Sequence, residues 1–310
     1  MDLIIGIATL ISSFMFLLII QKYFLKKNIV DEVIGRSSHN GVATRSGGLG
    51  IFTTLFLISV YYYFIGIQIF DYSLVIPLSI LLIVGLYDDL YNVDFKLKFL
   101  FQIITAKILI DNGLIIDNFH GILGIYELNR IFAQIFSVFV IVAIINSINF
   151  IDGIDGLAVL VVSLFIILFE FFALNQTPYS VLSIIILFSL IPFLYFNLFS
   201  KNKVFLGDSG SLLLGGLVSM YVLHILSNNY LIKAEYDVNK VLFVISILTY
   251  PIIDIIRVFF IRIFKGKSPF VADKNHIHHI ILKKVKSHWM TTFLIIILSS
   301  LFTVLVQIIF

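Results

Sequence analysis

The sequence predicts an all-α polytopic membrane protein with about ten transmembrane helices. Of its 310 residues, 60% are hydrophobic and only 13% are charged, whereas soluble domains carry roughly 25% charged residues. Mean hydropathy is correspondingly high, at +1.09. Apolar runs of about 20 residues, the length that crosses a hydrocarbon core, recur along nearly the whole chain. These runs are continuously apolar, so they favour helices over the alternating strands of a membrane barrel.

Each apolar run is interpreted as one spanning helix, and most linkers between the runs are short. The first run, Leu3 to Ile20, is interpreted as a retained helix because it lacks the basic start and the small-residue cleavage site of a secretory signal. No repeat of fixed period interrupts the pattern, so residues 1–310 are expected to form a single integral-membrane domain. The predicted spans are 3–21, 47–66, 73–87, 99–116, 131–147, 157–174, 179–197, 209–228, 239–257 and 290–310.

The lysines and arginines predict the orientation of these helices. Of 21 such residues, 17 lie in or beside the loops that follow the odd-numbered spans, three lie in the alternate loops, and Lys107 lies inside a span. Positive residues concentrate in cytoplasmic loops, so both termini are expected to face outward. Lys107 has two interpretations, namely an ion pair with Asp111 one turn on, which is favoured, or a contact with a lipid phosphate.

The remaining polar residues gather in five segments, and the predicted topology places all five on the cytoplasmic side. These segments are SSHNGVATRSGG, GLYDDL, NSINFIDGIDG, FLGDSGS and DKNHIHH. Five separate segments on one face are expected to form one composite active site. The chain has no cysteine, which excludes a thiolate nucleophile, a thiolate metal site and any disulfide.

The residue types in these segments favour phosphate chemistry around a hard cation. Carboxylates without thiolates suit Mg²⁺, which prefers oxygen ligands and often shares substrate phosphates. Arg45, Lys96, Lys98 and the histidines supply positive charge for phosphate oxygens. Carboxylates and cations around a metal describe phosphoryl transfer. Placement at the membrane edge indicates that one substrate is a lipid.

The third segment also has a helical pattern. Asn146 and Asn149 are three residues apart, and Asp152 or Gly153 continues the same spacing, so these side chains can line one face of a helix. Gly153 and Gly156 would let the backbone approach a ligand closely. The segment is therefore expected to bind a substrate at the end of the fifth span.

Each segment alone has a plainer interpretation. Asp88 and Asp89 could be a solvated carboxylate pair, and GDSGS could be a small-residue packing segment. HIHH could bind zinc, although the absence of cysteine and the basic loop argue against it. An ion-coupled transporter would place carboxylates near the bilayer midplane between two related halves, and the sequence shows neither feature.

Together, the five segments resemble the motifs of the polyprenyl-phosphate N-acetylhexosamine-1-phosphate transferases, bacterial membrane enzymes of the glycosyltransferase family 4 type. RSSHNGVATRSGG, GLYDDL, NSINFIDGIDGLA, FLGDSGS and SPFVADKNHIHH occur in the family's order, from Arg36 to His279. The resemblance implies transfer of a sugar-1-phosphate from a UDP-N-acetylhexosamine to undecaprenyl phosphate, with release of UMP. It implies a requirement for Mg²⁺, for which Mn²⁺ could substitute. It further implies a multi-pass protein of the bacterial inner membrane that binds the lipid bilayer and no nucleic acid, with a homodimer left open.

The resemblance also implies roles for particular residues around the metal and the lipid phosphate. Asp208 is expected to be a metal ligand, with Asp152 as a second. Asp88 and Asp89 are expected to be catalytic, either by acting on the lipid phosphate or by helping the metal and orienting the acceptor. The last motif contributes three catalytic histidines near the diphosphate, namely His276, His278 and His279.

On the substrate side, the resemblance assigns Asp152 and Asp155 to the nucleotide and Phe205 to an aromatic that stacks on uracil. Lys96 matches a lysine that contacts phosphate. The other expected substrate-binding residues are His39, Arg45, Asn146 and Asn149. Thr44 stands where the family often has proline, which could loosen the first loop without removing any chemistry.

The donor sugar is the main alternative within the family. SPFVADKNHIHH and RSSH resemble the enzymes that start O-antigen, lipopolysaccharide-linked, common-antigen and teichoic-acid polymers, which use UDP-GlcNAc or a related sugar. The alternative is the phospho-MurNAc-pentapeptide transferase of peptidoglycan synthesis, whose last loop carries a tight triple histidine. The surface-polysaccharide interpretation is preferred.

Overall fold

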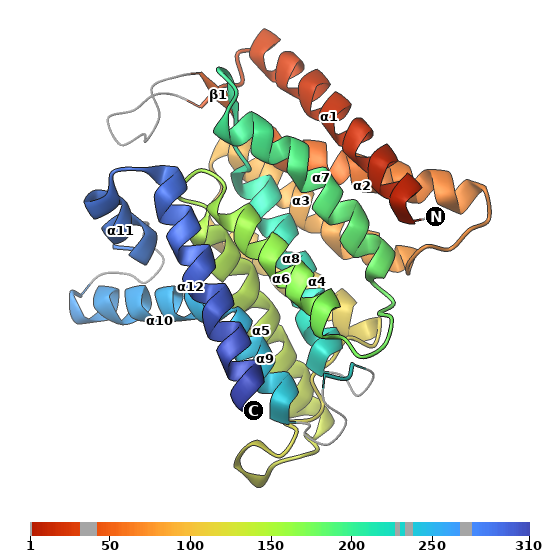
Figure 1. Ribbon diagram of the computed structural model, residues 1–310, viewed down its shortest axis with the longest axis vertical. Coiled ribbons are helices and arrows are strands. Elements are labelled where there is room, and N and C mark those ends of the chain that lie inside the picture. Colours follow the sequence, from red (N-terminus) through yellow and green to blue (C-terminus); the bar gives the residue numbers. More distant parts are fainter. Residues whose placement is uncertain (1, 32–41, 227–229, 233–237, 267–274) are drawn as a thin grey trace. The chain divides into compact units, whose positions relative to one another are not determined.

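The computed structural model describes residues 2–31, 42–226, 230–232, 238–266 and 275–310 (Figure 1). Within these residues the chain is mostly helical, and each predicted span overlaps a helix or, for the ninth, two consecutive helices. These helices are α1 (Asp2–Lys26), α2 (Gly47–Phe64), α3 (Val75–Tyr91), α4 (Phe95–Asp111), α5 (Arg130–Ile151), α6 (Leu157–Phe172), α7 (Ser180–Leu198), α8 (Gly207–Leu226), α9 (Val238–Ile247), α10 (Thr249–Phe264) and α12 (His288–Ile309). The short helix α11 (Ile277–Val285) was not predicted.

Seven helices in the described part of the chain are long and apolar enough to cross a membrane. Helices α9 and α10 would make an eighth span if the pair counts as one, although they are bent by 69°. The bend lies next to Pro251, in the first turn of α10, where proline is tolerated because its missing N–H has no helical partner. The chain is therefore a multi-pass membrane protein, and the span count of ten stays a prediction.

The all-α fold class needs one correction, a small parallel sheet. Strand β1 (Ala43–Thr44) pairs with β2 (Lys203–Val204), with Ala43 opposite Lys203 and Thr44 opposite Val204. Strands of two residues show no alternation that a sequence pattern could reveal. The sheet matters because it joins the first polar segment to the fourth. The pairing continues beyond the strands, where Phe205 N donates to Thr44 O at 2.8 Å.

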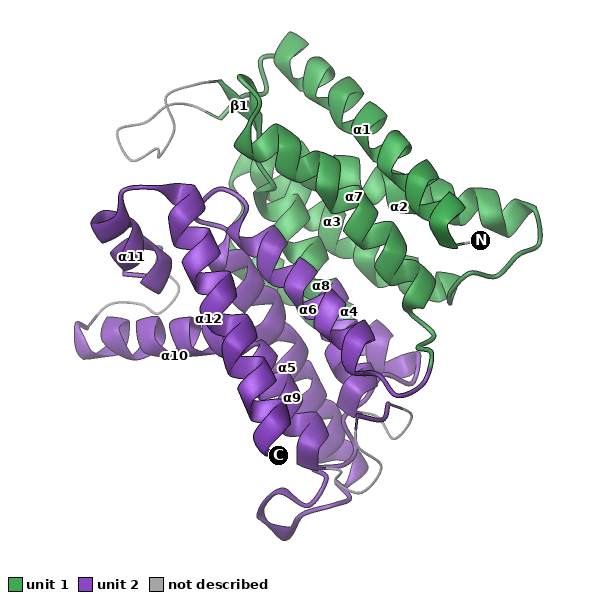
Figure 2. Cartoon of the chain, viewed as in Figure 1, with its two compact units in different colours: residues 1–105, 176–216 green, residues 106–175, 217–310 purple. Residues whose placement is uncertain are grey.

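The chain folds into two compact units that interleave along the sequence (Figure 2). Unit 1 comprises residues 1–105 and 176–216, and unit 2 comprises residues 106–175 and 217–310. In unit 1, α1 packs on α2 and α7, and α2 also packs on α3. In unit 2, α12 packs on α6, α9 and α11, and α5 packs on α6 and α10. The expectation of a single domain over the whole chain stays a prediction.

Candidate active site

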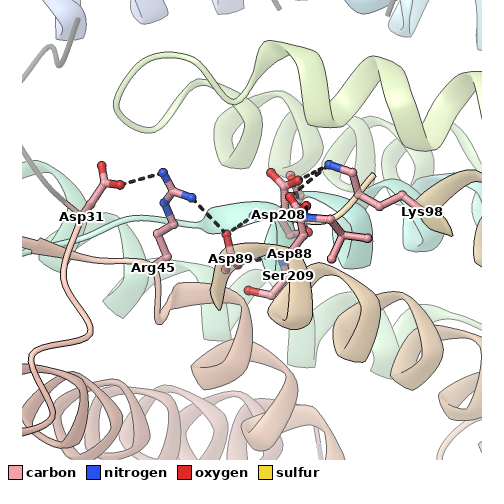
Figure 3. Close-up of polar contacts among 9 residues, drawn as sticks. Asp31, Arg45, Asp88, Asp89, Lys98, Asp208 and Ser209 are labelled. Carbon is pink, nitrogen blue, oxygen red and sulfur yellow. Dashed lines mark hydrogen bonds and ion pairs between the residues drawn. The ribbon is translucent and has the colours of Figure 1, made fainter. Parts of the chain in front are cut away.

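Three of the polar segments meet in unit 1, and two of them, the second and the fourth, are joined by one lysine (Figure 3). Lys98 Nζ donates to Asp88 Oδ2 at 3.0 Å and to Asp208 Oδ2 at 2.9 Å. All three side chains keep part of their surface exposed, with 13% for Asp88, 23% for Lys98 and 30% for Asp208. An ammonium group between two accessible carboxylates is a charged cluster that a phosphate or a metal ion can reach.

Local structure explains why Asp88 and Lys98 face each other. Helix α3 ends at Tyr91, and Asn92 adopts a left-handed conformation with φ of 52°, which asparagine tolerates better than most residues. Val93 N then donates to Asp88 Oδ1 at 2.7 Å. The chain thus turns back on the Asp88 carboxylate, and the first turns of α4 bring Lys98 to its other oxygen.

Asp89 has a different environment from its neighbour Asp88. Its side chain is only 2% exposed, and its two oxygens accept hydrogen bonds from Asp208 N at 2.9 Å and Ser209 N at 3.0 Å. These N–H groups belong to the first turn of α8, where backbone donors have no helical partner and a negative charge is favourable. Asp89 therefore holds the start of α8, and with it the backbone of Asp208.

Gly207 permits this approach. It has a φ of +71°, and a Cβ atom there would lie 2.5 Å from Asp89 Oδ2. Any other residue would be strained in this conformation and would push the carboxylate away. The glycine of the GDSGS segment thus lets a carboxylate from α3 reach the N-terminus of α8.

Arg45 comes to the same cluster from the first polar segment, through the small sheet. Its Nη2 donates to Asp31 Oδ1 at 2.6 Å, and its Nη1 lies 3.9 Å from Asp89 Oδ1. The Arg45 side chain remains 40% exposed, so it is accessible to an anionic ligand. Phe205, which follows β2, is half-buried beside this segment, and its carbonyl accepts from Gly47 N at 3.0 Å.

One predicted residue of this unit, Lys96, stands apart from the cluster. Lys96 is exposed, and its backbone N–H donates to Asp94 Oδ1 at 3.2 Å, whereas the side chain that joins the carboxylates belongs to Lys98. His39 lies outside the described residues. The favoured ion pair between Lys107 and Asp111 is present on α4.

The other two polar segments meet in unit 2. Helix α5 ends at Ile151, with Asp152 as its C-cap. Asn146, Asn149, Asp152 and Gly153 are all half-buried, while most of the residues between them are buried. They therefore share one partly exposed face, as their spacing predicts. Asn146 Nδ2 also donates to Val142 O at 2.7 Å.

His278 packs directly on this segment. It is fully buried, its Nδ1 lies 3.0 Å from the Tyr250 hydroxyl, and its Nε2 would be 2.5 Å from a Cβ atom on Gly153. Burial lowers the pKa of His278 to about 3, because its charged form is disfavoured away from water. His278 thus packs against position 153, where only glycine leaves room for its ring, and its catalytic role stays a prediction.

The other two predicted histidines flank His278. The ring of His276 stacks on that of His278 at 5.5 Å with an interplanar angle of 13°. The ring of His279 is 4.3 Å from that of His278 and tilted by 55°. His276 Nδ1 also lies 2.7 Å from Asp254 Oδ2, at hydrogen-bond distance. Sequence reasoning missed Asp254, although an aspartate inside a predicted apolar span is itself a signal of function.

His288 was also left outside the predicted site, yet it contacts the third segment. Asp155 N donates to His288 Nδ1 at 3.4 Å, and the same nitrogen lies 3.5 Å from Asp155 Oδ2. Thr292 Oγ1 donates to the Asp155 carbonyl at 3.2 Å. The first turn of α12 thereby anchors the turn between α5 and α6.

The five segments thus fall into two groups. The first, second and fourth meet in unit 1, and the third and fifth meet in unit 2. The convergence of all five on one site stays a prediction. Among the described residues, no group of three or more His, Asp or Glu could hold a metal ion by itself. Two carboxylates of unit 1 nevertheless approach a common cationic group.

Comparison with known proteins agrees with these motifs. The chain is 33% identical over 292 residues to the undecaprenyl-phosphate alpha-N-acetylglucosaminyl 1-phosphate transferase of Pasteurella multocida, covering 89% of this chain and 78% of that protein. It is 30% identical over 290 residues to a probable undecaprenyl-phosphate N-acetylglucosaminyl 1-phosphate transferase of Bacillus subtilis, covering 92% and 78%. The Haemophilus influenzae transferase is 30% identical over 291 residues, covering 89% and 78%. The model of glycosyl transferase family 4 matches residues 71–226. The chain belongs to this family.

Proposed function

We propose that this protein transfers N-acetylglucosamine 1-phosphate, or the 1-phosphate of a closely related N-acetylhexosamine, from the UDP-sugar to undecaprenyl phosphate. A lipid phosphate oxygen forms a bond to the phosphorus that carries the sugar, and the bridging P–O bond of the diphosphate breaks. UMP leaves with the electron pair. The names of the relatives support the acceptor and the transferred group.

The observation that carries this proposal is the cluster of Asp88, Lys98 and Asp208. It is partly exposed, carries both signs of charge, and lies at the end of the apolar helix α3. Phosphoryl transfer depends mainly on positioning and on stabilisation of charge. A phosphate monoester is already mostly ionised at neutral pH, so the attack needs no general base. Asp88 therefore acts by position and charge rather than by removing a proton.

The cluster also fits Mg²⁺, because two carboxylate oxygens lie within 3.0 Å of one cationic group, Lys98 Nζ. Asp208 and Asp88 would hold the ion. Mg²⁺ usually binds through one or two carboxylates together with substrate phosphates and water, so a cage of protein ligands is not required. When bound, it supplies charge neutralisation for the diphosphate. Mn²⁺ would bind the same hard oxygen ligands, and Asp152 stays a predicted ligand.

The positive side chains of unit 1 have the complementary role. We assign to Lys98 the phosphate contact expected of Lys96, because Lys98 is the lysine in the carboxylate cluster. Arg45 is exposed enough to bind a phosphate oxygen. Guanidinium groups suit this role because their donors match phosphate geometry.

In unit 2, the partly exposed face of α5 is assigned to the nucleotide-sugar. Asn146, Asn149 and Asp152 present amide and carboxylate groups there, and Asp155 is held by α12. In unit 1, Phe205 remains assigned to stacking on uracil. These assignments follow the family motifs.

We place the reacting groups on the cytoplasmic side of a bacterial inner membrane, with both chain termini outside. Of the 21 lysines and arginines, 17 lie in or beside the loops assigned to that side, as is typical of cytoplasmic loops. No observation favours UDP-MurNAc-pentapeptide as the donor, since the relatives are named for the N-acetylglucosaminyl group. The product would be the first lipid-linked intermediate of a surface polysaccharide.

A reconstituted assay tests the proposal. Purified full-length protein is given undecaprenyl phosphate, Mg²⁺ and one UDP-sugar at a time, and UMP release is compared with lipid-extractable sugar. Equal amounts of both from UDP-GlcNAc or a related UDP-N-acetylhexosamine are expected. Asp111→Asn, which removes an exposed carboxylate of α4, is the matched active control. Product from UDP-MurNAc-pentapeptide alone, or from no donor, would refute the proposal.

A further inference from the structure

Asp254 is a buried carboxylate inside an apolar helix, and both of its oxygens have hydrogen-bond partners. It lies on α10 and is 1% exposed. Oδ2 pairs with His276 Nδ1 at 2.7 Å, and Oδ1 accepts from Ile277 N at 2.8 Å and from Arg257 Nη2 at 3.2 Å. A buried charge is retained only where such partners offset its desolvation. Two of the partners, His276 and Ile277, belong to the segment that carries the histidine motif. The third, Arg257, donates to the carbonyl of Asn275 in the same segment.

The contact with His276 determines which ring nitrogen carries a proton. A carboxylate oxygen can only accept, so Nδ1 must be the protonated nitrogen of the His276 ring. Nε2 is then the nitrogen left to act on a ligand. The plane of the ring is also fixed, because it stacks on His278 and lies 6.0 Å from the ring of Phe150, which is the residue after Asn149.

The same carboxylate holds the backbone on which His276 is mounted. His276 is the N-cap of α11, and Ile277 is its first residue. The bond from Ile277 N to Asp254 satisfies one of the donors that a helix N-terminus leaves open. Arg257 pairs with Asp254 and also donates to the carbonyl of Asn275. Ring and backbone are thus fixed by one group.

We propose that Asp254 is a positioning residue for the transfer reaction. It keeps His276 in the Nδ1–H form and directs Nε2 toward the phosphate groups of the nucleotide-sugar. This inference rests on the proposed function, in which His276 acts near the diphosphate. Asp254 itself contacts no reacting atom. Carboxylates that orient metal-ligating imidazoles contribute about 10- to 100-fold to affinity or activity, and we expect an effect of the same order here.

The substitution Asp254→Asn separates the two effects of the carboxylate. Asparagine keeps one acceptor oxygen, so it can serve Ile277 N or His276 Nδ1 but not both. If its amide group faces the imidazole, it donates to Nδ1 and moves the ring proton to Nε2. Transfer by this variant is expected to fall about 10- to 100-fold. Asp111→Asn is the matched control and is expected to keep the wild-type rate.

The first readout is the ¹⁵N spectrum of the full-length protein labelled at its seven histidines, with the His276 signals assigned by their loss in His276→Gln. The wild type is expected to show a proton on Nδ1 of His276, and Asp254→Asn to lose that state. This measurement needs neither substrate nor metal. A wild-type spectrum with the proton on Nε2 alone would overturn the inference, even if the variant failed to fold.

The second readout is a double-mutant cycle on UDP-GlcNAc binding and on transfer. If Asp254 acts through His276, adding Asp254→Asn to His276→Gln should cause no further loss. Independent losses that add would overturn the inference and leave Asp254 a purely structural residue. If the wild type itself makes no product, the proposed function fails. If the wild type is active and Asp254→Asn matches it, only the positioning role fails.

Discussion

Substitution by asparagine should have different effects at the paired aspartates. At Asp89 it should mainly lower the stability of the fold, and at Asp88 it should mainly lower kcat. Asp89→Asn removes one of two carboxylate oxygens that accept from Asp208 N and Ser209 N, at a site only 2% exposed. A buried donor left without an acceptor costs about 1–3 kcal/mol, and the lost negative charge at a helix N-terminus costs about 0.3–1 kcal/mol more. Asp89→Asn is therefore expected to destabilise the folded protein by roughly 2–3 kcal/mol.

Asp88→Asn should cost much less stability. Its Oδ1 accepts from Val93 N, and an amide oxygen can replace it. The ion pair with Lys98 is partly exposed, where such pairs contribute about 0–1 kcal/mol. Lys98 also keeps its bond to Asp208. The stability difference between the two variants should thus be about 2 kcal/mol in favour of Asp88→Asn.

Two measurements check the predicted difference in stability and activity. Both variants are unfolded by heat in the same detergent, and transfer is then assayed on the folded fraction of each. Asp89→Asn should unfold several degrees below the wild type, and Asp88→Asn close to it. Asp88→Asn should nevertheless lose most of its kcat, because we assign its carboxylate to the metal ion and the reacting phosphates. A stable Asp89→Asn with a kcat as low as that of Asp88→Asn would refute the assignment of Asp89 to holding α8.

Three further predictions concern the same site. Asp208→Asn should abolish transfer and lower the affinity for Mn²⁺ measured by electron paramagnetic resonance. The variant should still elute like the wild type in size-exclusion chromatography. Unchanged Mn²⁺ binding would contradict the role of Asp208 as a metal ligand. Lys98→Gln should reduce kcat/KM by at least tenfold and the exposed Lys96→Gln should not, and equal losses would contradict our assignment. For His278, whose pKa is about 3 in the folded protein and about 6.5 in an unfolded chain, the unfolded state binds more protons between these values. Stability should therefore fall as the pH decreases from 6.5 toward 3, and His278→Phe should reduce this dependence in denaturation measured by circular dichroism.

Helix positions could be predicted from the sequence because they depend on local composition. The spans predicted at 47–66 and 157–174 begin where α2 and α6 begin and end two residues beyond them. A continuous apolar run fixes a membrane helix without reference to the rest of the chain. Helix α11, whose nine residues include two lysines, lacks such a run and was missed.

The choice between Lys96 and Lys98 could not be made in this way. Successive residues of a helix are 100° apart, so positions 96 and 98 point about 200° apart, to nearly opposite sides of α4. Only the contacts between α4, α3 and the start of α8 select Lys98. The same limit applies to Asp254, whose partner His276 is 22 residues away. A sequence pattern identifies which residue types are unusual, but pairing between segments decides their roles.

The two units use one arrangement to retain carboxylates in an apolar chain. In unit 1, Asp89 of α3 accepts from the first turn of α8, which carries Asp208. In unit 2, Asp254 of α10 accepts from the first residue of α11, whose N-cap is His276. In each case the open N–H groups and the positive end of a helix dipole offset the desolvation of the carboxylate. The residue that is fixed in place stands at the same helix start, so a single buried bond both stabilises the fold and positions the chemistry. Substitution of either buried aspartate should therefore affect activity through the position of a neighbouring residue. Rates alone cannot distinguish this effect from a direct role. The decisive measurements are the tautomer of His276 in the wild type and the stability of Asp89→Asn.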